Sequence, residues 1–159
     1  KGISEVTDPE IVVFVDGDFS DYPEEIENLV KPIVENRADF VLGSRMIFSE
    51  SRAALLPQAR YGNLLAVFLI RLFFRYKFTD LGPFRAIRYQ SLKEISMTDK
   101  NFGWTVEMQI KAVKHGLKIM EIPVHYRKRI GVSKITGTIS GTFKAGIKII
   151  FTIFKFLLT

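Results

Sequence analysis

The amino-acid sequence predicts an α/β fold in which a mixed, mostly parallel sheet is flanked by helices. An uninterrupted apolar run, Ile11 to Val15, has the pattern of a strand buried on both faces of such a sheet. Strand-like and helical segments alternate from this run to the end of the chain, which is typical of α/β proteins. A length of 159 residues suffices for one domain with a sizeable hydrophobic core.

The first part of the chain has the pattern strand, helix, strand. A helix is expected to begin near Ser20, with Pro23 in its first turn, and its apolar residues recur at helical spacing as far as Ile33. Residues 38–42 form the second expected strand, which ends at Gly43-Ser44-Arg45.

The later elements follow from apolar periodicity and from stop signals such as Gly116. We expect a loop over 46–57, an apolar helix over 58–75, a strand within 82–88, helices over 89–95 and 102–115, a strand over 117–126, a basic loop over 128–138 and a helix from 139 onward.

The composition limits the chemistry. The net charge of +6 favours anionic partners such as phosphates, nucleic acid or an acidic membrane surface. The chain has no cysteine, which excludes disulfides, thiolate metal sites and a cysteine nucleophile. No stretch reaches the roughly eighteen apolar residues that a membrane-spanning helix needs. Because the first expected strand lies so close to Lys1, we expect an N-terminal half, with further strands, to be missing from this sequence.

The C-terminal segment 139–159 is expected to be an amphipathic helix. Lys144, Lys148 and Lys155 fall within about 40° of one another on a helical wheel, and large apolar residues occupy most other directions. One interpretation is a helix packed on the core with its lysines directed outward. The other is an interfacial helix that binds anionic lipid.

Asp16-Gly17-Asp18 follows the first strand directly and places two carboxylates at the end of the sheet where ligands bind in open α/β folds. Two such carboxylates can share a divalent cation, which in turn holds a diphosphate. A plain Asp-Gly turn is the simpler interpretation. An EF-hand loop is a third, but Asp21 stands where its sharp turn needs glycine, and Pro23 lacks a backbone N–H.

Later segments add cations and decide between these interpretations. Arg45 ends the second strand, and guanidinium groups favour bidentate contacts with phosphate oxygens. Asp80 and Arg85 flank a tight turn, and residues 127–134 carry four cations in eight positions. Together these groups favour a site for a cation and a diphosphate over a plain turn.

The ordered motifs Asp16-Gly17-Asp18, Gly43-Ser44-Arg45 and Asp80 with Gly82-Pro83-Phe84-Arg85 resemble the family-2 glycosyltransferases of GT-A fold, which is Rossmann-like. The chain is most similar to the dolichyl-phosphate mannosyltransferase and polyprenyl-phosphate glycosyltransferase branch. The segments 102–109, 121–124 and 129–134 continue the match, which covers nearly the whole chain. The resemblance implies a partial GT-A domain over residues 1–138, followed by the amphipathic helix 139–159.

The resemblance also implies a reaction. Asp16 and Asp18 would bind Mg²⁺ or Mn²⁺ and, through it, the diphosphate of a GDP- or UDP-linked sugar, and Arg45 would lie near the nucleotide. A hexose would be transferred, with inversion at its anomeric carbon, to a polyprenyl phosphate. The nucleotide sugar, the lipid phosphate and the membrane surface are therefore the expected partners.

Asp80 and Arg85 match the family's acceptor-side motif, and Arg85 is grouped with the residues that bind the nucleotide sugar. Asp80 would be the general base if the acceptor were a hydroxyl, and its alternative role is that of a turn or capping aspartate. Arg129, Ser133 and Lys134 match a cationic loop that closes over the diphosphate and the acceptor phosphate. Arg129 and Lys134 would stabilise the charge on the leaving group.

Arg60 and Asn63 match the start of a helix that touches the membrane in this branch. The expected location is the cytoplasmic side of a membrane, peripheral or anchored by segments outside this chain. Two other classes remain: a non-catalytic membrane-surface or anion-binding fragment of a split enzyme, and a basic nucleic-acid-binding domain. The second lacks an aromatic-basic RNA motif, so no nucleic-acid partner is expected.

Overall fold

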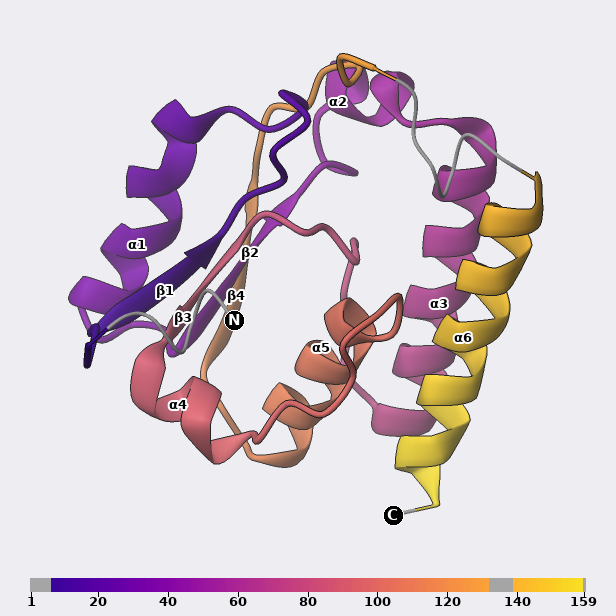
Figure 1. The fold of residues 1–159 in the computed structure, drawn as a ribbon. Helices are drawn as coiled ribbons and strands as arrows, with labels where there is room; N and C mark the ends of the chain where they lie inside the picture. The colour runs from indigo at the N-terminus through magenta and orange to yellow at the C-terminus, as the bar shows by residue number, and fades with distance from the viewer. Residues whose placement is uncertain (1–6, 132–138, 159) are drawn as a thin grey trace.

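The computed structural model describes residues 7–131 and 139–158, and the centre of this part is a four-stranded sheet (Figure 1). Its strands are β1 (Ile11–Phe14), β2 (Phe40–Ser44), β3 (Arg85–Arg88) and β4 (Ile119–Pro123), in the order β1-β3-β2-β4. β2 and β4 are parallel, and β3 is antiparallel to both β1 and β2. β1, β2 and β4 therefore end at the same edge, and the α/β class with a mixed sheet is confirmed.

Helices cover both faces of this sheet (Figure 1). The helical elements are η2 (Pro23–Glu25), α1 (Ile26–Val34), α2 (Ser49–Ala54), α3 (Pro57–Phe74), α4 (Tyr89–Glu94), α5 (Trp104–Lys114) and α6 (Ile139–Leu157). On one face, Leu29 and Ile33 of α1 pack in a cluster with Val41 of β2. On the other, Phe40 and Leu42 of the same strand join the larger cluster of α3, α5 and α6. Because β2 is buried on both faces, it is apolar at successive positions.

Two expectations about local structure are wrong. The run 11–15 is not a buried parallel-type strand, because β1 lies at the edge of the described sheet, is partly exposed and pairs antiparallel with β3. An apolar run specifies extended structure but not the neighbour or its direction. The segment 46–57 is not only a loop, because it contains α2, where the Ser51 hydroxyl donates to the Val124 carbonyl at 3.1 Å. Such a short polar helix has no apolar periodicity that would reveal it.

The C-terminal helix α6 packs against α3 and α5, and its Ile153 is fully buried in the core that they share. The Lys148 side chain is 39% accessible, and its Nζ forms an ion pair with Asp99 Oδ2 at 2.8 Å. None of the described helices is long and apolar enough to cross a bilayer.

α3 and α6 lie side by side (Figure 1). Large apolar side chains are exposed on both helices. Those on α3 are Tyr61, Leu64, Leu65, Phe68 and Leu72. Those on α6 are Phe143, Ile147, Phe151, Phe154 and Leu157, and Leu158 follows the helix directly. We call this set the apolar ridge. Neither helix contains Asp or Glu.

Candidate functional site

The acidic turn after β1 is held against the segment that follows β4. Asp21 forms an isolated antiparallel bridge with Tyr126. The backbone N–H of Ile130 donates to the carbonyl of Asp18 at 3.0 Å. β1 and β4 thereby contribute to one site, although two other strands separate them in the sheet.

Asp18 is held from two sides. Its Oδ1 accepts a hydrogen bond from the backbone N–H of Ser20 at 3.0 Å and a short one from the Ser20 hydroxyl. Its Oδ2 forms an ion pair with Arg129 Nη2 at 3.1 Å. The contacts from Ser20 orient the carboxylate, so that its second oxygen faces the cationic segment after β4.

A third carboxylate, Asp21, lies next to the pair and was not predicted as a site residue. It is 2% exposed, and its Oδ2 accepts the backbone N–H of Asp16 at 3.3 Å. Its Oδ1 is buried and accepts no hydrogen bond from any described residue. Burial raises the pKa of Asp21 to about 6. Desolvation, followed by the nearby Asp18 carboxylate, also raises the pKa of Asp16.

Arg45 and Asp80 form a bidentate ion pair at the end of β2. Nε and Nη2 of Arg45 lie 2.8 and 2.9 Å from the two carboxylate oxygens, and the backbone N–H of Arg45 donates to Asp80 Oδ2 at 2.9 Å. Gly82 makes this approach possible, because a Cβ there would lie 2.7 Å from the carbonyl oxygen of Gly43 and 3.1 Å from Asp80 Oδ2. Burial opposes the charge of Arg45, but Asp80 outweighs burial and raises the pKa of Arg45.

Arg45 connects this ion pair to the acidic turn. Its guanidinium carbon lies 5.1 Å from the centre of the Tyr126 ring, and Tyr126 forms the bridge to Asp21. The charge of Arg45 also acts on Asp16 and Asp21, where it lowers each pKa against the larger effect of burial. The structure therefore brings together five of the predicted site residues: Asp16, Asp18, Arg45, Asp80 and Arg129.

Arg85 lies in the core rather than on this cluster. Its guanidinium is fully buried and donates to the backbone carbonyls of Leu81, Gly82 and Thr105. It also lies 5.2 Å from the centre of the Trp104 ring. Burial lowers the pKa of Arg85 to about 9. From the core, Arg85 holds the backbone of the turn at Gly82, and its charge lowers the pKa of Asp16 against the larger effect of burial.

The sequence interpretation missed two residues that hold Asp80. The Glu121 carboxylate of β4 accepts hydrogen bonds from the backbone N–H groups of Thr79 at 2.9 Å and Asp80 at 3.2 Å. Gln109 of α5 donates to the carbonyl of Asp80 at 2.9 Å. An acidic residue within an apolar strand was the available signal for Glu121. The predicted residues Ser133 and Lys134 lie outside the described part of the chain.

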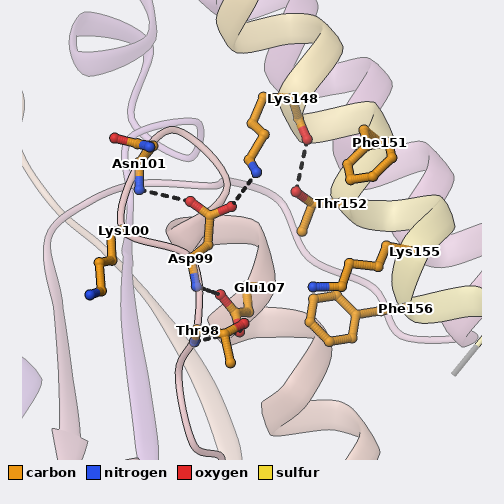
Figure 2. A pocket seen from close by; sticks show the side chains of 10 residues that line it. All are labelled: Thr98, Asp99, Lys100, Asn101, Glu107, Lys148, Phe151, Thr152, Lys155 and Phe156. Carbon is orange, nitrogen blue, oxygen red and sulfur yellow. Dashed lines mark hydrogen bonds and ion pairs between the residues drawn. The ribbon is translucent and has the colours of Figure 1, made fainter.

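A separate cavity of about 360 Å³ lies between α6, α5 and the segment 98–101 (Figure 2). Glu107 is fully buried there and accepts a hydrogen bond from the backbone N–H of Thr98 at 2.9 Å. It also forms an ion pair with Lys111 at 2.8 Å, as expected for oppositely charged residues four positions apart on a helix. Asp99 forms an ion pair with the ammonium group of Lys148. Both carboxylates of the cavity are therefore paired, and no predicted site residue is among those that line it.

The donor set of the acidic cluster suits a divalent cation that a ligand completes. No group of three or more His, Cys, Asp or Glu in the described ranges is arranged to hold a metal ion by itself. Mg²⁺, however, is commonly bound by one or two carboxylates together with substrate phosphates and water. Asp16 and Asp18 supply hard oxygen ligands, and the buried, unpaired Oδ1 of Asp21 adds negative charge beside them.

Comparison with known sequences identifies the family. The profile of Glycosyl transferase family 2 matches residues 1–96 of the 159. The chain belongs to this family. The matched range contains the acidic turn, the Arg45–Asp80 pair and Arg85, so the family resemblance of the ordered motifs is confirmed.

Several curated proteins resemble this family 2 member. An uncharacterized protein of Methanocaldococcus jannaschii is 31% identical over 137 residues, which cover 81% of this chain and 56% of that protein. The undecaprenyl-phosphate mannosyltransferase of Micrococcus luteus is 26% identical, with coverages of 83% and 56%. The UDP-N-acetylglucosamine–dolichyl-phosphate N-acetylglucosaminyltransferase of Methanococcus voltae is 29% identical, with coverages of 72% and 47%. The chain spans about half the length of these relatives.

Proposed function

We propose that this family 2 member transfers a hexose from a GDP- or UDP-linked sugar to a polyprenyl phosphate, with inversion at the anomeric carbon and with Mg²⁺ or Mn²⁺. The observation that carries the proposal is the cluster of Asp16, Asp18, Arg45 and Arg129, which the ends of β1 and β2 and the segment after β4 bring together. Opposite charges gathered from three segments suit a ligand that combines a metal ion with a diphosphate. The acceptor class is supported by relatives named for undecaprenyl phosphate and dolichyl phosphate.

In the proposed reaction an oxygen of the lipid phosphate attacks the anomeric carbon. The bond from that carbon to the nucleoside diphosphate breaks, and its electron pair leaves with the diphosphate. A divalent cation held by Asp16 and Asp18 would supply positive charge there. Arg129 would add a second positive charge. Ser133 and Lys134 would belong to the same loop over the diphosphate and the acceptor phosphate, as the sequence resemblance implies. Electrostatic stabilisation of a leaving group is usually the largest contribution to such catalysis.

The environment of Asp80 supports a phosphate acceptor over a hydroxyl. Asp80 is fully buried, and both of its carboxylate oxygens accept hydrogen bonds from Arg45. A carboxylate in this position is poorly placed to take a proton from an acceptor hydroxyl. A phosphate monoester, with a second pKa of about 6, is mostly dianionic at neutral pH and needs no strong base. We therefore assign Asp80 the role of holding Arg45.

We propose, in addition, that the apolar ridge binds a membrane surface. The ridge lies on the two packed helices α3 and α6, which carry arginines and lysines but no acidic residue. Exposed apolar side chains beside cations suit a bilayer that contains anionic lipids. The segment 139–159 would then be the interfacial helix of the unit formed by residues 1–138. The corresponding location is the cytoplasmic side of a membrane, peripheral or anchored by segments outside this chain.

Asp18→Asn in the full-length protein tests the proposal. The substitution is expected to abolish metal-dependent transfer of labelled hexose to polyprenyl phosphate, because it removes charge that would hold the cation. Asp8→Asn is the matched control, since Asp8 is exposed, lies before the opposite end of β1 and has a φ of 43°, which Asn accepts. Equal transfer by the two folded variants would refute the assignment. Binding of oligonucleotides by a protein inactive with every nucleotide sugar would favour the nucleic-acid alternative.

A further inference from the structure

The Asp18 carboxylate presents two oxygens with different partners. Oδ1 accepts the backbone N–H and the hydroxyl of Ser20, which belongs to the same turn. Oδ2 is paired with Arg129, which approaches from the segment after β4. Oδ2 is therefore the oxygen that can change partner without opening the turn.

A divalent cation on Oδ2 would meet the guanidinium of Arg129 at contact distance. Two positive charges so close repel each other, and partly buried surroundings screen that repulsion only in part. We propose that Arg129 and the divalent cation exchange at Asp18, so that binding of the metal releases the guanidinium, which then binds the diphosphate of the nucleotide sugar. This inference rests on the proposed function, because it assigns an order to two contacts of the same site.

The backbone around Arg129 is fixed in a way that permits this exchange. The side chain of Arg127 donates to the carbonyl of Phe19 at 2.7 Å, and its guanidinium carbon lies 3.5 Å from the centre of the Phe19 ring. On the other side of Arg129, the backbone N–H of Ile130 donates to Asp18. The Arg129 side chain can thus leave Asp18 while its backbone keeps its place over the acidic turn.

The local charge also favours the exchange. Asp16, Asp18 and Asp21 belong to one turn, in which the backbone N–H of Asp16 donates to Asp21 Oδ2 at 3.3 Å and Asp21 Oδ1 is buried without a hydrogen-bond partner among the described residues. Arg45 is nearby but is engaged by Asp80. A doubly charged ion balances this cluster better than the single charge of Arg129.

Binding of Mn²⁺ to the full-length protein without nucleotide, measured by electron paramagnetic resonance, tests the exchange. Arg129→Gln removes the competitor. Lys128→Gln, the matched control, removes the same charge from an exposed neighbouring side chain. The Arg129–Asp18 pair is partly exposed, with side chains 33% and 22% accessible. We therefore expect R129Q to bind Mn²⁺ about 2- to 5-fold more tightly than K128Q. Equal or weaker binding by R129Q overturns the exchange.

The Nε–H resonance of Arg129 gives a second readout by nuclear magnetic resonance. The spectrum of R129Q assigns this signal. Added Mg²⁺ is expected to move it in the wild-type protein toward its position in Asp18→Asn. A signal that stays in place while the metal binds overturns the exchange.

The outcomes separate the inference from the proposed function. Wild-type protein that binds no Mn²⁺ overturns both the exchange and the metal part of the proposed function. Saturable binding that Asp18→Asn abolishes, together with equal affinities of R129Q and K128Q, removes the exchange and leaves the proposed function standing.

Discussion

Replacing Asp80 by Asn probes the ion pair at the end of β2. Asp80 is fully buried and accepts three hydrogen bonds from Arg45, two from the guanidinium and one from the backbone. Asparagine keeps the shape of the side chain but removes its charge. It also turns an NH₂ group toward a guanidinium, which can only donate. Arg45, with 14% of its side chain exposed, would be left with an uncompensated charge.

The size of the effect follows from this burial. Removal of one partner of a buried ion pair costs about 3–5 kcal/mol, and the remaining exposure of Arg45 favours the lower end, about 3 kcal/mol. For a chain of this length that loss lowers Tm by about 6–12 °C. Asp39→Asn is the matched control, because Asp39 pairs with Arg88 at 3.7 Å and both side chains are about one-third exposed. Its expected cost is below about 1 kcal/mol.

Urea denaturation followed by circular dichroism measures both losses. The double variant Asp80→Asn with Arg45→Met should recover part of the stability, because it leaves no buried charge unpaired. A loss for D80N that equals the loss for D39N would refute the reasoning from burial, because it would mean that solvent screens the Arg45–Asp80 pair.

Three further predictions concern other parts of the molecule. The raised pKa of Asp21 means that the folded protein keeps a proton that the unfolded chain releases. The free energy of unfolding should therefore fall by about 3 kcal/mol as pH rises from about 3 to 7, and Asp21→Asn should remove this fall in urea titrations with a chelator present. Gly103→Ala should cost about 1–3 kcal/mol in the same assay, since its Cβ would lie 2.6 Å from a side-chain oxygen of α6. Combined Phe68→Ser and Phe151→Ser should weaken co-sedimentation with anionic vesicles several-fold, because both rings are exposed on the apolar ridge.

Each of these predictions has a control within the chain. Wild-type and D21N curves of equal slope would contradict the burial of an ionisable Asp21. Gly62→Ala, in open space within α3, should stabilise the protein by about 0.5–1 kcal/mol, so a similar loss in both glycine variants would remove the packing argument. Val34→Ser changes an exposed apolar residue of α1, outside the ridge, and should leave vesicle binding intact.

The sequence predicted most helices and strands because their apolar spacing is regular. α3 and α5 lie within two residues of the expected ranges 58–75 and 102–115. The place of β1 could not be predicted, since an apolar run carries no information about its neighbour in the sheet. The short helix α2 was missed because its six residues offer no complete apolar period.

The candidate site was predictable in its residue types but not in its pairings. Arg45 and Asp80 were both expected, yet their bidentate contact depends on how closely the turn at Gly82 approaches β2, which spacing along the chain does not reveal. Asp21 was considered only as a departure from an EF-hand loop. Its burial depends on the bridge to Tyr126, a residue far away in sequence.

The close approach at Gly82 gives a way to recognise the same arrangement in proteins of unknown structure. A methyl group at this position would overlap the carbonyl of Gly43 and crowd the Asp80 carboxylate. A homologue with alanine or a larger residue at the aligned position must shift its turn away from the neighbouring strand and separate the two charged groups. Homologues that combine glycine there with an arginine aligned to Arg45 and an aspartate aligned to Asp80 should share the geometry. Three aligned positions can therefore sort family members before their structures are known.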